Sequence, residues 1–117
     1  RCMLRLDFST TNGPLLRRNK AYLETVIGEV VDWAKSKNAA LYMGEFGAGI
    51  PCFKKGKGGL IWVEEMVGIL KTNNIHFAYH SYHSHSQDSF ALYVSGGLPN
   101  PANVNQPLID WFTNNLN

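Results

Sequence analysis

The sequence predicts an α/β fold, in a single domain covering residues 1–117, with parallel strands joined by helices. Two observations predict this class. Apolar residues recur at helical spacing in three segments of the chain, and a short apolar run follows each of the first two segments. This alternation is typical of a parallel sheet with right-handed crossovers, so we expect about three strands and three helices.

The first predicted element is a half-exposed strand in residues 1–8. Apolar and polar side chains alternate there, with the apolar ones at Leu4, Leu6 and Phe8. The turn-forming residues that follow, in 9–14, end the strand. No motif in this segment indicates a function.

Three helices are predicted from apolar stripes. The first covers residues 19–37, and its stripe consists of Leu23, Val26, Ile27, Val30 and Ala34. The second covers residues 60–72, with one face formed by Leu60, Val63, Met66, Val67 and Leu70. The third has Pro107 in its first turn, where proline is tolerated, and carries Leu108, Trp111, Phe112 and Leu116. The tryptophans on these helices are expected to pack in the core: Trp33, Trp62 and Trp111.

Two further strands follow the first two helices. The first, in residues 39–47, fits a buried strand of a parallel sheet, and its apolar run leads into one carboxylate, Glu45. Gly44 and Gly47 allow a sharp turn or a close backbone approach at its end. A buried charge needs a partner or a purpose, because desolvation costs free energy. The second strand covers residues 75–82, and its period places three residues on one face: Ala78, His80 and Tyr82.

The composition fits a globular domain. Hydrophobic residues make up 44% of the chain and the formal net charge is +2, so we expect neither a nucleic-acid partner nor a membrane surface. No apolar run approaches the roughly 20 residues of a membrane span. Two cysteines, Cys2 and Cys52, are too few for a disulfide framework, and a bridge between them stays open. The start at Arg1, without a signal-peptide pattern, suggests a processed or truncated chain and leaves secretion open.

The Gly-Glu-Phe-Gly sequence at residues 44–47, with the order of elements around it, resembles the nucleophile strand of glycoside hydrolase family 5, the cellulase and mannanase family. The resemblance runs from residue 19 to the C-terminus. It implies the last part of a (β/α)8 barrel, in which this stretch closes the seventh strand. It also implies a relative of retaining endo-β-glucanases that act on plant-wall β-linked polysaccharide, with no cofactor.

The same resemblance assigns the candidate site residues. The glutamate of this motif is the family's nucleophile, so Glu45 is expected to take that role; a structural carboxylate paired with a lysine is the alternative. His80 stands where the family commonly has a sugar-binding tryptophan. We expect the sugar site to be lined by His80, Tyr82, His83, Phe53 and Asp88. A structural histidine at position 80, or a loop metal site at His83, His85 and Asp88, are alternatives, but no metal is predicted.

A second carboxylate, which a retaining glycosidase needs as its acid and base, is not recognisable in this chain. The family has a glutamate preceded by asparagine, and no Asn-Glu pair occurs here. Most other acids fall on predicted helices, whereas Asp88 falls in a loop on the side of Glu45. Activity of the chain alone therefore stays open. The alternatives are a non-catalytic carbohydrate-binding domain and an inert folded remnant.

An incomplete barrel also predicts a partner. Three strands cannot close a barrel, and an open sheet leaves unpaired backbone groups at two edges. The missing part is expected from a complementing N-terminal fragment or from further copies of the chain in a homo-oligomer. A small stand-alone domain, with helices on both faces of its sheet, is the remaining possibility.

Overall fold

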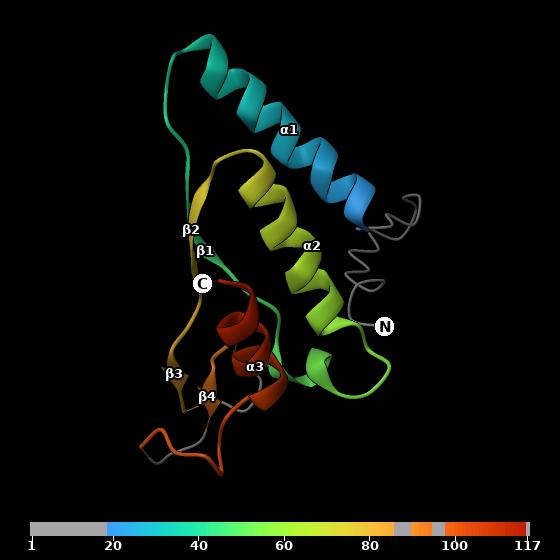
Figure 1. The fold of residues 1–117 in the computed structure, drawn as a ribbon, viewed down its shortest axis with the longest axis vertical. Helices are drawn as coiled ribbons and strands as arrows, with labels where there is room; N and C mark the ends of the chain where they lie inside the picture. Colours follow the sequence, from blue (N-terminus) through green and yellow to red (C-terminus); the bar gives the residue numbers. More distant parts are fainter. Residues whose placement is uncertain (1–18, 86–89, 95–97, 117) are drawn as a thin grey trace, which may run out of the picture.

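Helices and strands alternate along the computed structural model, which describes residues 19–85, 90–94 and 98–116 (Figure 1). The order is α1 Lys20–Ser36, β1 Tyr42–Phe46, a 3-10 helix η2 Ile50–Phe53, α2 Gly59–Thr72, β2 His76–Tyr79, β3 His83–Ser84, β4 Tyr93–Val94 and α3 Gln106–Asn115. The three predicted helices are confirmed. The strand predicted in residues 1–8 lies outside the described residues.

The strands form two small parallel sheets. β1 pairs with β2 in one sheet, and β3 pairs with β4 in the other. The parallel pairing predicted from the alternation of elements is therefore confirmed for β1 and β2. Since β1 and β2 are neighbours joined through α2, they form one β–α–β unit, which α1 precedes along the chain (Figure 1).

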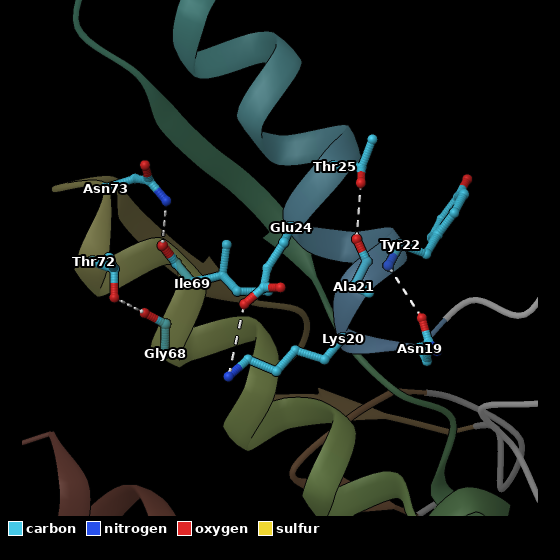
Figure 2. Close-up of polar contacts among 10 residues, drawn as sticks. All are labelled: Asn19, Lys20, Ala21, Tyr22, Glu24, Thr25, Gly68, Ile69, Thr72 and Asn73. Atoms are coloured by element: carbon cyan, nitrogen blue, oxygen red, sulfur yellow. Dashed lines mark hydrogen bonds and ion pairs between the residues drawn. The ribbon is translucent and has the colours of Figure 1, made fainter.

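The buried stripe of α1 differs from the predicted one. Asn19 caps the helix, because its side-chain oxygen accepts the N–H of Tyr22 at 3.1 Å (Figure 2). The buried residues are Leu23, Ile27, Val31 and Ala34. Val26 and Val30, which the predicted stripe includes, are 41% and 48% exposed, and Trp33, expected in the core, is 59% exposed. These three expectations are wrong because α1 packs on α2 through the adjacent side of the helix.

Both long helices end with an asparagine in the left-handed backbone conformation. Asn38 and Asn74 have φ angles of 50° and 54°, which asparagine tolerates better than most residues. The residue after each asparagine donates its N–H back into the helix at 2.9 Å, from Ala39 to Ala34 and from Ile75 to Leu70. This is the hydrogen bond of a Schellman motif, and after it the chain enters β1 or β2.

The hydrophobic core forms around α2, which lies between α1 and the pair β1–β2 (Figure 1). Its predicted stripe is confirmed, since the buried residues include Val63, Met66, Val67 and Leu70. Leu108 brings α3 into the same cluster and is fully buried. Trp62 and Trp111 are half-buried against it, as predicted.

The strand predicted in residues 75–82 is shorter in the structure and ends at Tyr79. β1 ends at Phe46, whose carbonyl accepts the N–H of His80 at 2.8 Å. Beyond His80, β1 offers no further partner for the ladder. The chain instead forms β3, in which His83 lies opposite Tyr93 of β4.

The segment between β1 and α2 contains the short helix η2. Cys52 in this helix is disulfide-bonded, and no cysteine among the described residues is free. Cys2, the other cysteine of the chain, lies outside the described residues. None of the described helices combines the length and the apolar character needed to cross a membrane.

Candidate functional site

A bulge in β1 sets the direction of the Glu45 side chain. Met43 pairs with Phe77 and Phe46 pairs with Tyr79, so β1 advances three residues where β2 advances two. The extra residue in β1 breaks the simple alternation of faces. As a result, Phe46 returns to the face that Met43 occupies, and Glu45 does not share that face.

The face that carries Phe46 is the one packed against the helices. The Phe46 ring lies 5.5 Å from that of Phe77, 5.4 Å from that of Tyr79 and 6.3 Å from that of Trp62 in α2. Because neighbouring residues of a strand point to opposite faces, Glu45 projects from the open face. Its side chain is 76% exposed. The expectation of a buried strand is therefore wrong, since one face of β1 is uncovered in the described structure.

His80 is the polar partner of Glu45. Its Nδ1 atom lies 3.9 Å from Oε2 of Glu45, and its side chain is 49% exposed. The backbone N–H of His80 donates to Phe46, the residue after Glu45 in β1. The two side chains thus share the open face at the carboxyl ends of two adjacent parallel strands. This edge of a parallel sheet is where α/β enzymes place their reactive groups.

Gly47 lets the two strand ends approach each other. A Cβ atom at this position would lie 2.5 Å from the carbonyl oxygen of His80 and 3.0 Å from the Cβ of Phe90. A contact of 2.5 Å with a backbone oxygen leaves no room for a side chain. The predicted close approach at Gly47 is therefore confirmed, and it brings Phe90 next to the site.

Tyr79 anchors the loop that follows Glu45. Its hydroxyl accepts the N–H of Ala48 at 3.2 Å and lies 3.3 Å from the carbonyl of the same residue, to which it can donate. Burial raises the pKa of Tyr79 above 10.0, an effect that the hydrogen bond to Ala48 partly offsets. The two contacts of the hydroxyl hold Ala48 beside the end of β2.

The other predicted sugar-site residues are dispersed. Tyr82 is 64% exposed, and its ring lies 5.3 Å from that of Tyr93. The His83 ring contacts that of His85 at 5.2 Å. Phe53 packs against the core from η2 and borders a cleft of about 610 Å³ formed by residues 52–61 and Asn19. Asp88 lies outside the described residues. The structure thus brings together Glu45 and His80 but leaves Phe53 on a separate cleft.

Two further clefts among the described residues lie away from Glu45. One of about 420 Å³ separates α1 from α2, where Lys20 and Glu24 form an ion pair at 3.7 Å (Figure 2). A second of about 480 Å³ is lined by Ile75, Phe77 and neighbouring residues. Neither has Glu45 or His80 in its lining. Across the described ranges, no three side chains of the metal-binding types come together to hold an ion.

Sequence reasoning missed Phe90 as a site residue. The short apolar run at residues 90–94 was the available signal, because it interrupts an otherwise polar stretch. In the structure the Phe90 ring lies 6.4 Å from that of His80. The segment that follows β2 therefore supplies an aromatic side chain to the open face.

Comparisons with known proteins give similar folds but no family. No family model matches the chain, and no curated protein matches it. A hyperthermophilic endo-β-1,4-glucanase, crystallised with substrate, is 21% identical with a TM-score of 0.60, over 77% of this chain and 26% of its own. An endoglucanase is 21% identical with a TM-score of 0.56, over 76% of this chain and 26% of its own. Cellulose synthase subunit Z of Clostridioides difficile is 24% identical with a TM-score of 0.50, over 63% of this chain and 23% of its own.

These similarities show a shared fold. The chain is glycoside hydrolase-like in its fold, as the Gly-Glu-Phe-Gly resemblance implies. It spans about a quarter of the length of each of these structures. The described residues thus match one portion of each of these larger structures, and they carry the carboxylate of Glu45 and the imidazole of His80 on the open face.

Proposed function

We propose that the chain is the last part of a family 5-like (β/α)8 barrel and that Glu45 is its nucleophile, acting on a β-1,4-linked polysaccharide. One observation carries the proposal. The bulge in β1 directs Glu45 away from the helices, onto the face that forms the inside of a barrel. The endoglucanase-like fold and the Gly-Glu-Phe-Gly sequence support the same assignment.

In the proposed reaction, the Glu45 carboxylate attacks the anomeric carbon of the sugar. A bond forms between that carbon and a carboxylate oxygen, while the bond to the glycosidic oxygen breaks and that oxygen takes a proton from a second carboxyl group. Water then hydrolyses the glycosyl ester and restores the carboxylate. His80, within 3.9 Å of the carboxylate, orients it towards the substrate.

The second carboxyl group comes from outside the described residues. Within the described ranges, each other carboxylate lies on a helix, and the set comprises Glu24, Glu29, Asp32, Glu64, Glu65 and Asp110. The helices pack on the face opposite Glu45, whereas a retaining pair needs carboxyl groups about 5 Å apart. Asp88, or a residue of the missing barrel strands, would have to serve as the acid and base.

The missing strands are proposed to come from a partner. Among the described residues β1 pairs on one side only, so the backbone groups of its second edge are available. In a parallel sheet of β–α units, helices lie side by side in the order of their strands. A strand added to β1 would therefore lie under α1, against the exposed Val26, Val30 and Trp33. A complementing fragment or a further copy of the chain would supply this strand.

A non-catalytic carbohydrate-binding domain is the second candidate. The observation that favours it is the absence of a second carboxylate near Glu45 within the described part of the chain. In that case Glu45 and His80 would bind sugar hydroxyls by hydrogen bonds. The two candidates differ in one outcome, the release of reducing ends from a bound glucan.

Hydrolysis of carboxymethylcellulose by the purified chain, followed by the release of reducing sugar, tests the proposal. Glu45→Gln should lower the rate by on the order of 10⁶-fold, the scale seen when a covalent nucleophile is removed. The matched control is Glu64→Gln on α2, which is exposed and should leave the rate unchanged. Hydrolysis that persists in Glu45→Gln would contradict the mechanism. Binding without hydrolysis, by the chain alone and by the chain with its complementing fragment, would favour the second candidate.

A further inference from the structure

We propose that Phe90 is a stacking platform for a hexose ring of a β-1,4-linked glycan, beside Glu45. The inference rests on the proposed function and names a residue that determines which glycan the site accepts. It also gives the segment after β2 a role, since that segment carries Phe90 to the open face.

Contacts place Phe90 beside Glu45. The Phe90 ring lies 6.4 Å from that of His80, and His80 lies 3.9 Å from Glu45. On its other side, the Cβ atom of Phe90 would lie 3.0 Å from a Cβ atom added to Gly47. Phe90 thus adjoins Gly47, directly after β1, and His80, directly after β2. An apolar ring and a carboxylate therefore lie within one small area of surface.

The backbone after Phe90 is held by hydrogen bonds, whereas the side chain of Phe90 is only half covered. Ala91 is fully buried, and the N–H of Leu92 donates to the carbonyl of Ser81 at 2.8 Å. The N–H of Tyr93 donates to Tyr82 at 3.0 Å in the same ladder. Phe90 nevertheless remains 45% exposed. A half-exposed aromatic ring on a fixed backbone is suited to contact a ligand with little loss of entropy.

The chemistry of the ring selects the class of ligand. A β-1,4-linked glucose unit carries its hydroxyls at the edge and presents C–H groups on its two flat faces. Such a ring can stack on phenylalanine while its edge donates hydrogen bonds to Glu45 and His80. An α-1,4-linked chain coils and does not present the same extended series of flat faces. The site should therefore prefer β-1,4-linked glucan over α-1,4-linked glucan.

Binding of cellopentaose and maltopentaose, measured by isothermal titration calorimetry, tests the platform. The wild type should bind cellopentaose and bind maltopentaose more weakly. Phe90→Ala should raise the Kd for cellopentaose roughly 10-fold, as expected for the loss of a contact with half of an aromatic ring. Phe90→Trp, which keeps an aromatic face, should retain binding. The control is Ile61→Ala on α2, which is 55% exposed and lines the separate cleft of residues 52–61; this variant should leave the Kd unchanged.

The outcomes separate the platform from the proposed function. If the wild type binds neither oligosaccharide, the proposed function fails and the platform fails with it. If the wild type binds cellopentaose and Phe90→Ala binds it equally well, the platform alone is overturned. An equal rise of the Kd in Ile61→Ala would also overturn the platform, because the effect would then be independent of the site. Circular dichroism of each variant shows whether a change in Kd reflects the loss of folded protein.

Discussion

Gly47 is the residue whose identity the site constrains most clearly. The carbonyl of His80 and the side chain of Phe90 crowd the position where a Cβ would stand. Gly47→Ala should therefore lower the free energy of unfolding by about 1–3 kcal/mol, the usual cost of overpacking. Thermal unfolding followed by circular dichroism measures this change.

Gly68 is the matched control for Gly47. It lies within α2, and a Cβ at this position would meet nothing within 4 Å. Gly68→Ala should stabilise the protein by about 0.5–1 kcal/mol, because alanine loses less backbone entropy in a helix. A Gly47→Ala variant as stable as Gly68→Ala would show that His80 and Gly47 do not approach each other in solution.

At the residue scale, the sequence indicated where Glu45, Gly47 and His80 lie at the strand ends, but it did not indicate their contact with Phe90. A lone carboxylate between glycines, after an apolar run, is a local pattern and can be recognised. Phe90 could not be assigned in this way, because it is 43 residues beyond Gly47 in the numbering and meets it only through the fold. Contacts between distant segments leave no local pattern in one sequence.

At the element scale, the ends of the helices were predictable and the bulge in β1 was not. Asn38 and Asn74 follow the apolar stripes of the two long helices, a position where asparagine commonly ends a helix, and both adopt the left-handed conformation that does so. The bulge depends instead on how β1 pairs with β2, with Met43 and Phe46 as its flanking residues. Pairing between strands is a tertiary property, so no pattern within residues 42–46 indicates it.

The stripe of α1 illustrates the same limit. Helical spacing predicts one broad apolar stripe, whereas the structure buries only the side that meets α2. Val26, Val30 and Trp33 remain exposed on an adjacent side. Their apolar character fits a helix that has neighbours on two sides, as the helices of a closed barrel do.

At the scale of the whole molecule, the exposed side of α1 predicts association, as does the edge of β1 that no described strand pairs with. Because an uncovered apolar surface favours self-association, the mass from sedimentation equilibrium should exceed that of the monomer. Val30→Glu combined with Trp33→Glu should reduce it to the monomer mass. The control is Thr25→Glu, at an exposed polar position of the same helix, and it should not reduce the mass to that of the monomer. A monomeric wild type would exclude a homo-oligomer and leave the complementing fragment as the proposed partner.

Because no second carboxylate lies near Glu45 among the described residues, the nucleophile is best tested with a substrate whose leaving group needs no proton. Within the described residues the other carboxylates lie on the helices, so protonation of a natural leaving group would be slow. A glycosyl fluoride avoids this requirement, because fluoride leaves without a proton. Fluorine at the sugar's second carbon then slows hydrolysis of the ester, and the glycosyl-enzyme accumulates.

Mass spectrometry after incubation with 2-deoxy-2-fluoro-β-cellobiosyl fluoride is the most direct test of Glu45 as a nucleophile. We predict one covalent disaccharide adduct, located on Glu45 by peptide mapping, and no adduct in Glu45→Gln. An adduct on a different carboxylate, or an unlabelled Glu45 in a chain that hydrolyses β-1,4-glucan, would contradict this account.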